Sequence, residues 1–317
     1  MSGFARIGAF AALLAVVFAA AAMAGSKVSP EVDEPESHMG SEGDKAMLSH
    51  EETTGAAGAT EHGGHEEGAG GNALPGLAVA QDGYRLVPGQ DILIAERDQN
   101  LNFTIEREDG STVDQFDVTH DRRLHLIVVR RDFQGFQHLH PKQIEDGSWT
   151  VRIGDLAPGA YRVFADFSTG GQPLTLATDQ FVPGQFDPEP LGPVARTADA
   201  GDGYQVSLLT FRASGGQTVP VDFEVTKNGK VVDGVQPYLG ADGHLVALRQ
   251  GDQAFLHTHP EGEPGGPGPI SFQVSYPTAG SYRLYIQFKH GGEVRTAEFT
   301  RVVGGNQHEH GEDGSHG

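Results

Sequence analysis

The chain has 317 residues, a formal net charge of -21 and no cysteine. The acidic balance argues against nucleic acid as a partner and favours cationic ligands. Without cysteine, the chain cannot form disulfides, iron–sulfur clusters, thiolate zinc sites or a copper site built on a thiolate, so fifteen histidines and four methionines remain as soft or borderline metal ligands.

The first 24 residues have the features of an export signal. Arg6 precedes a run of apolar or small residues over 7–24, and Ala22-Met23-Ala24 fits a small-x-small cleavage site. The run is also just long enough to remain as a membrane anchor, so both outcomes stay open. In either case we expect the rest of the chain outside the cytoplasm, in the cell envelope or extracellular.

Two flanking segments are predicted to be disordered. Residues 25–73 contain eleven acidic residues and two lysines but few large apolar ones, and the His-rich tail 305–317 is similar. Such segments cannot bury enough apolar surface to fold. They fit either solvated spacers or loose metal-scavenging tails, because imidazoles beside carboxylates bind divalent metals weakly without any fold.

Between these segments the chain contains an internal repeat. Residues 125–141, HLIVVRRDFQGFQHLHP, align without a gap with residues 244–260, HLVALRQGDQAFLHTHP, and eight of the seventeen positions are identical. A sequence repeated at this distance indicates two copies of one structural unit. We therefore expect one domain over 78–183, a Pro- and Gly-rich linker over 184–202, and a second domain over 203–304.

Each copy has the pattern of an antiparallel β-sandwich. Short alternating or apolar runs such as YRLV, LNFTIE and WTVRI are broken by turn residues, and outside the signal no apolar period of helical length is found. The segments ending at Tyr161 and Tyr282 resemble the tyrosine corner of immunoglobulin-like domains. The predicted fold class is all-β, with two tandem immunoglobulin-like antiparallel β-sandwich domains flanked by disordered tails.

The repeated stretch carries three histidines at the same spacing in both copies. In the first copy, His138 and His140 share one face of a strand, and His125 lies on the partner strand of a predicted hairpin. If His125 pairs opposite either of them, all three imidazoles can reach one ion, whereas a slip of one residue turns His125 away. The sequence thus predicts one metal site in each copy, formed by His125, His138 and His140, and by His244, His257 and His259.

Only the first copy offers candidates for a fourth ligand. His120 precedes His125 by five residues, and Asp166 lies in the strand VFADF. The second copy has Tyr238 or Leu239 at the position of His120 and Gln287 at that of Asp166. If either first-copy residue ligates, the two sites are unequal and the first is the richer one.

Imidazole ligands suit copper(II), zinc and nickel. Copper(II) is the favoured metal for an exported protein without thiolates, and zinc is the second candidate. An exported β-sandwich with clustered histidines and no cysteine resembles the CopC-like and YtkA-like copper-handling proteins in architecture. The string HLIVVRRDFQGFQHLHP is similar to that of secreted actinobacterial proteins of the heavy-metal-binding type. CopC-like proteins carry a histidine at the mature N-terminus, whereas cleavage after Ala24 would leave Gly25, so the resemblance implies only metal binding by the histidine triplets.

The favoured function is metal buffering or delivery in the cell envelope, without catalysis. The expected partners are metal ions and another envelope metal-handling protein, and the membrane is met only through residues 7–24 if they are not cleaved. Binding should weaken below about pH 6.5, because ligation needs neutral imidazole. One alternative is a cupin-like metalloenzyme, in which Glu145 or Glu263 follows the H-x-H pair. Another is a structural or adhesive envelope protein with no metal.

Overall fold

A computed structural model of the protein describes residues 74–305, which belong to one compact unit. Between these residues the chain forms strands and no helix, so within that range no helix is long and apolar enough to cross a membrane. The predictions of a signal peptide or anchor over 1–24, of disorder over 25–73, and of a His-rich tail up to residue 317 lie outside the described residues, apart from residue 305.

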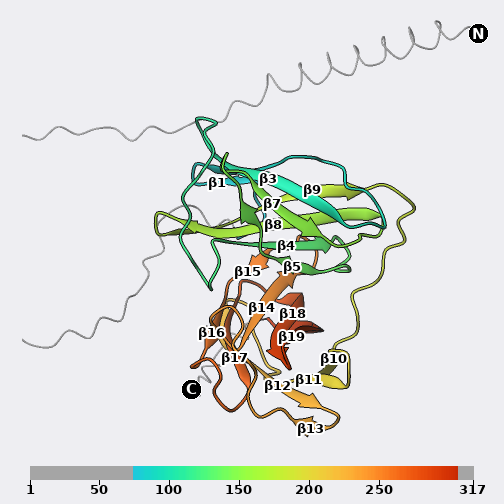
Figure 1. The fold of residues 1–317 in the computed structure, drawn as a ribbon. Coiled ribbons are helices and arrows are strands. Elements are labelled where there is room, and N and C mark those ends of the chain that lie inside the picture. Colours follow the sequence, from blue (N-terminus) through green and yellow to red (C-terminus); the bar gives the residue numbers. More distant parts are fainter. Residues whose placement is uncertain (1–73, 306–317) are drawn as a thin grey trace, which may run out of the picture. The chain divides into compact units, whose positions relative to one another are not determined.

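The first domain consists of two antiparallel sheets, with strand orders β1-β2-β3-β7-β6 and β5-β4-β8-β9 (Figure 1). Its strands are β1 (Ala80–Gln81), β2 (Tyr84–Pro88), β3 (Gln99–Arg107), β4 (Leu124–Arg130), β5 (Gln137–Leu139), β6 (Lys142–Gln143), β7 (Trp149–Ile153), β8 (Gly159–Thr169) and β9 (Gln172–Val182).

The second domain repeats this arrangement with sheets β10-β11-β12-β17-β16 and β15-β14-β18-β19, and β13 pairs with β12. Its strands are β10 (Thr197–Asp199), β11 (Tyr204–Leu208), β12 (Gln217–Lys227), β13 (Lys230–Val231), β14 (Gly243–Arg249), β15 (Phe255–Leu256), β16 (Thr258–Glu261), β17 (Ile270–Tyr276), β18 (Gly280–His290) and β19 (Glu293–Val303).

The all-β fold class and the tandem immunoglobulin-like sandwiches are confirmed. One boundary differs from the expectation: β10 pairs with β11, so the second domain begins at residue 197 and not at 203. The sequence before residue 203 is rich in Gly and Pro and therefore predicts a linker. Such composition does not reveal a three-residue edge strand.

The predicted local features are also present. The hydroxyl of Tyr161 donates to the carbonyl of Ala157 at 3.0 Å, and that of Tyr282 to the carbonyl of Thr278 at 2.8 Å, so both tyrosine corners form. The two Gly-Gly turns that follow these strands have positive φ at both residues, which suits the tight hairpins that join β8 to β9 and β18 to β19.

Each domain has its own apolar core, produced by alternation along the strands. In β3, for example, Leu101, Phe103 and Ile105 are buried, while the residues between them are exposed or half-buried. They pack with Trp149 in the first core, and the equivalent second core includes Phe223 and Phe272. Period-two burial of this kind is what an outer sheet of a sandwich requires.

β4 and β14 differ, because they are buried on both faces. Leu124, Leu126 and Val128 belong to the first core, whereas Ile127 and Val129 belong to a third cluster. That third cluster combines residues of both domains and is the interface between them, where β4 and β5 lie beside β14 and β15 (Figure 1). Its members are Ile127, Val129, Phe133, Phe164, Ala177, Val246, Leu248, Phe255 and Tyr285.

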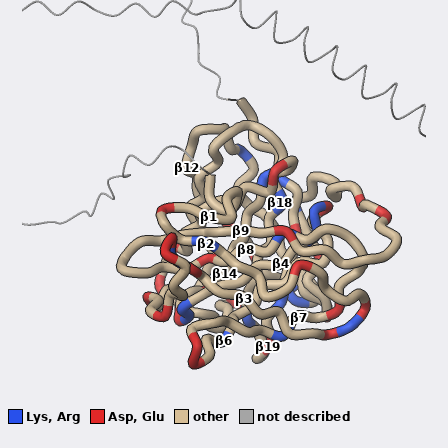
Figure 2. Tube along the Cα trace, turned by 90° about the horizontal axis from the view of Figure 1, so that it is seen from above, with Lys and Arg blue, Asp and Glu red and all other residues tan. Residues whose placement is uncertain are grey.

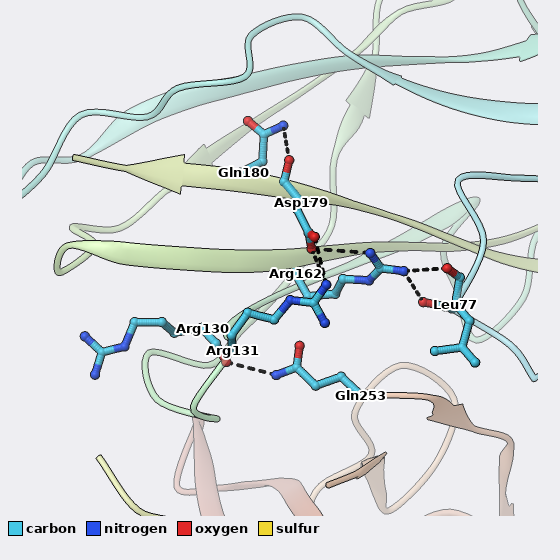
Figure 3. A network of polar contacts seen from close by, with 8 residues as sticks. Leu77, Arg130, Arg131, Arg162, Asp179, Gln180 and Gln253 are labelled. Atoms are coloured by element: carbon cyan, nitrogen blue, oxygen red, sulfur yellow. Dashed lines mark hydrogen bonds and ion pairs between the residues drawn. The ribbon is translucent and has the colours of Figure 1, made fainter. Parts of the chain in front are cut away.

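Aromatic and polar contacts complete this interface. The rings of Phe136 and Tyr285 stack with centroids 4.0 Å apart, and the Tyr285 hydroxyl donates to the carbonyl of Phe133 at 2.7 Å. Nearby, Gln253 of the second domain donates to the carbonyl of Arg130 at 2.9 Å (Figure 3). A hydrogen bond of this kind favours association of the domains by a net of only about 0.5–1.5 kcal/mol, because water replaces it on separation.

The segment before β1 passes through the same interface. The amide of Gly76 donates to the carbonyl of Thr175, and the amide of Phe255 donates to the carbonyl of Pro75, both at 2.9 Å, so the segment contacts both domains. The guanidinium of Arg162, paired with Asp179, donates to the carbonyl of Leu77 (Figure 3). Gly76 has φ of +70°, and a Cβ there would lie 2.7 Å from the Phe164 ring.

Candidate metal centre

Three histidines of the first domain converge on one point. In the β4–β5 ladder, Leu126 faces Leu139 and Ile127 faces His138, and extending this register sets His140 across from His125. The three imidazoles therefore share one face, as the hairpin prediction required. A nitrogen from each of His125, His138 and His140 lies within 4.8 Å of the other two.

The face that carries them points towards the second domain. His125 alternates with the core residues Leu124 and Leu126 and lies on the same side of β4 as Ile127. The histidines therefore lie outside the sandwich core, at the domain interface. This position shields them from water.

Hydrogen bonds fix the tautomers of two of these rings. Nε2 of His125 lies 3.2 Å from the carbonyl oxygen of Thr119, to which it donates. Nδ1 of His138 lies 2.8 Å from Oε1 of Gln287, whose amide nitrogen in turn donates to a threonine on β19. In a neutral imidazole the remaining nitrogen is then an acceptor.

Those two acceptors face each other. Nδ1 of His125 and Nε2 of His138 are 3.0 Å apart. Two lone pairs at that distance repel each other unless a proton or a metal ion lies between them. Two metal–nitrogen bonds of about 2.0–2.1 Å at an angle between about 90° and 110° separate their nitrogens by roughly 2.9–3.4 Å. The observed distance therefore matches a shared ion.

Burial disfavours the proton as the shared cation. It lowers the pKa of His125, and it lowers the pKa of His138 well below the usual histidine value, to which the neighbouring His125 adds. The pKa of His140 falls to about 4, mainly through burial. Neutral rings with lone pairs directed at one point are the state that a metal requires.

His140 leaves a polar atom without a partner. Its Nε2 is buried, and no hydrogen bond reaches it. A buried nitrogen without a partner costs about 1–3 kcal/mol of stability. An apolar residue at position 140 would therefore make the fold more stable, which indicates that His140 serves a purpose other than stability.

A strained turn before each central strand orients one histidine. Thr119 bridges to Arg122 across two residues of positive φ, His120 at 49° and Asp121 at 60°. In the second domain, Tyr238 bridges to Ala241 across Leu239, whose φ is 55°, and a glycine. The carbonyl of Tyr238 accepts from Nε2 of His244 at 3.1 Å, as that of Thr119 does from His125.

The expectation of one site in each copy needs correction at this point. His244 lies beside the first cluster, with its ring centroid 5.9 Å from that of His125 and 5.8 Å from that of His138. Within residues 74–305, the cluster of the first domain is the one group of three or more histidines or carboxylates with converging ligand atoms.

His257 and His259 do not form the expected triplet with His244, because the chain changes sheets between β15 and β16. β15 pairs with β14, the strand of His244, but ends at Leu256, and β16 pairs with β17 in the other sheet. His257 and His259 are exposed, and their ring centroids are 4.4 Å apart. In the first domain β5 is one residue longer and keeps His138 in the ladder.

The two additional candidates lie near the cluster but outside the converging group. Asp166 faces His125 across the β4–β8 ladder and accepts a 2.7 Å hydrogen bond from Thr175. Burial raises the pKa of this carboxyl group. His120 is exposed in its turn, with its ring centroid 6.1 Å from that of His125 and 5.5 Å from that of His244.

Sequence reasoning missed the contribution of the second domain. The repeat identifies Gln287 only as the counterpart of Asp166, yet in the structure Gln287 orients His138 across the interface. A usable signal was present: the runs HLIVV and HLVAL are apolar at successive positions, which indicates strands buried on both faces. Two such strands, in a chain whose other strands alternate, predict that the outer face of each of their sheets is covered by another part of the protein.

Together these features define an all-β protein of two tandem immunoglobulin-like domains with clustered imidazoles at their junction. The chain belongs to the family described as a domain of unknown function, DUF8832, whose model matches residues 78–183 and 197–305. No curated protein matches it.

The solved structures similar to it include two bacterial adhesins, and the chain spans slightly less than two thirds of either. The Escherichia coli adhesin FdeC is 11% identical with a TM-score of 0.22, over 72% of this chain and 66% of that chain. The Yersinia pseudotuberculosis adhesin InvE is 11% identical with a TM-score of 0.21, over 74% of this chain and 65% of that chain.

Proposed function

We propose that the protein binds one divalent transition-metal ion through His125, His138 and His140. The observation that carries this proposal is the 3.0 Å approach of two imidazole acceptors whose other nitrogens are already engaged. Hydrogen bonds from the distal nitrogen of a ligating histidine to a carbonyl or amide oxygen are typical of metal sites, because they set the ring orientation and the basicity of the ligand.

The ligand chemistry favours copper(II), with zinc as the second choice. Three imidazoles without thiolate suit both ions. The resemblance to secreted heavy-metal-binding proteins agrees with this role, and so does the acidic net charge of the chain, which attracts cations.

Binding rather than catalysis is the role we assign. The converging group contains three histidines and no carboxylate that could act as a general base. Neither glutamate of the cupin-like alternative is a member of it. Buffering the ion, or passing it to another metal-handling protein of the cell envelope, fits an exported chain. An envelope or extracellular location is part of this proposal.

A structural or adhesive role without metal is the second candidate. It is favoured by the apolar interface that joins the two sandwiches into one unit. In the view of Figure 2, Lys and Arg lie interspersed with Asp and Glu along the described residues, so this view points to no particular charged macromolecular partner for that role.

The two H-x-H pairs offer a matched test. The full-length protein would be titrated with copper(II), zinc and nickel in competition with a chelator, beside the double variants His138→Ala/His140→Ala and His257→Ala/His259→Ala. Metal binding predicts one tight ion, lost in the first variant and kept in the second. Equal loss in both variants, or tight binding in neither variant nor the parent, would favour the structural role.

A further inference from the structure

The interface brings equivalent positions of the two repeats together. His125 and His244 occupy the same position in the repeated sequence, and the same holds for Asp166 and Gln287. In the structure, His125 faces Asp166 across β4 and β8, and His244 faces Gln287 across β14 and β18. The two sheets pack so that both pairs adjoin one cluster, with Gln287 bonded to His138.

From this arrangement we infer that His244 is the fourth ligand and that the bound ion holds the two domains together. The inference rests on the proposed function. Nε2 of His244 donates to the carbonyl of Tyr238, so Nδ1 keeps its lone pair. His244 is half-buried beside the cluster.

The ring spacings support a four-imidazole site. In a tetrahedral site with metal–nitrogen bonds of about 2.0 Å, neighbouring ring centroids lie roughly 5.2 Å apart. Those of His125, His138 and His140 are 5.0–5.2 Å apart. The ring of His244 is 5.8 Å from that of His138 and 5.9 Å from that of His125, so both distances are within about 1 Å of this spacing.

A clamp follows from thermodynamic linkage. An ion that takes ligands from both domains binds the closed arrangement more tightly than any opened one, so it stabilises the closed arrangement. Gln287 strengthens the coupling, because separation of the domains would also remove the acceptor that orients His138.

The test compares full-length protein with single variants, using copper(II) and zinc in chelator competition. For His244→Ala we expect affinity to fall at least tenfold. His244→Gln, which can still donate to the Tyr238 carbonyl, guards against a folding defect and should show the same loss. His257→Ala, at an exposed position of the same domain, should stay within about twofold. His120→Ala should behave like His257→Ala, because the side chain of His120 is exposed whereas that of His244 is half-buried.

Hydrogen exchange at the interface measures whether the ion holds the domains together, independently of its affinity. The Phe255 amide, which donates across the interface to Pro75, should exchange more slowly when the parent protein binds metal, and this slowing should vanish in His244→Gln. Unchanged affinity in both His244 variants, or a large loss in His120→Ala instead, would overturn the inference. So would metal binding without slower exchange at Phe255. A parent protein that binds no metal would refute the proposed function itself, which is a distinct result.

Discussion

Replacing His140 with leucine should stabilise the metal-free protein and at the same time abolish metal binding. The Nε2 atom of His140 is buried without a partner, at a cost of about 1–3 kcal/mol that the substitution removes. Leucine has a similar volume and suits a site beside buried β4. We therefore expect the free energy of unfolding of the metal-free protein to rise by about 1–2 kcal/mol. For a folded part of this size, that corresponds to roughly 2–8 °C in melting temperature.

The order of stability should reverse when metal is present. An ion at 100 times its dissociation constant stabilises the parent protein by about 2.7 kcal/mol, and the His140→Leu variant should lose this gain. Thermal unfolding in chelator and in excess zinc measures both effects, and His259→Leu at an exposed position is the matched control. If His140→Leu unfolds at a lower temperature in chelator, or still gains stability from zinc, the reasoning fails.

Three further predictions follow from the same site and interface. The free energy of unfolding of the metal-free protein should fall as pH drops from about 6.5 towards 4. The folded pKa values of His140 and His244 are lowered to about 4 while unfolded histidine titrates near 6.5, so the unfolded state binds protons first, with a slope of up to about 1.4 kcal/mol per pH unit for each ring. Denaturant titrations at pH 7.5, 6 and 5 measure this, and identical midpoints would contradict it. Gln287→Leu should weaken metal binding about 10- to 100-fold because His138 loses its partner, whereas Gln273→Leu, at an exposed hydrogen bond, should not. Tyr285→Phe should cost about 1–2 kcal/mol, because the buried carbonyl of Phe133 loses its donor, and an unchanged midpoint in urea would argue against that contact.

The pH range in which metal is bound also changes from the expectation based on sequence. Ordinary histidines predict weaker binding below about pH 6.5. Because burial lowers the pKa values of His140 and His244 to about 4, protons should compete with the ion only at lower pH. Affinity that persists to about pH 5 is therefore compatible with histidine ligation at this site.

The sequence was sufficient for the fold class and for the candidate histidines of the first-domain cluster. Alternation, turn residues and the repeat predict two sandwiches, and period-two geometry predicts that His138 and His140 share a face, which His125 joins in the observed register. These inferences succeed because they depend on contacts between neighbouring strands. Strand pairing is encoded locally, through side-chain alternation and hairpin length.

The position of His244 beside the first-domain cluster could not be predicted in this way. Identical spacing suggested that His244, His257 and His259 would form a second triplet, but β15 ends one residue too early and His257 leaves the ladder. The association of His244 with the first cluster depends on how two sheets pack across a domain interface. Local alternation carries no information about which covered faces meet.

The entry of the chain through the domain interface has a mechanical consequence. Residues 75–78 are hydrogen-bonded to Thr175 and Ala177 of the first domain and to Phe255 of the second. A pulling force applied upstream of residue 74 would reach these bonds before it reached either sandwich core. The hydrogen bonds of residues 75–78 would thus break first under load, while the direct contacts between the two domains, such as that of Tyr285 with Phe133, do not depend on this segment.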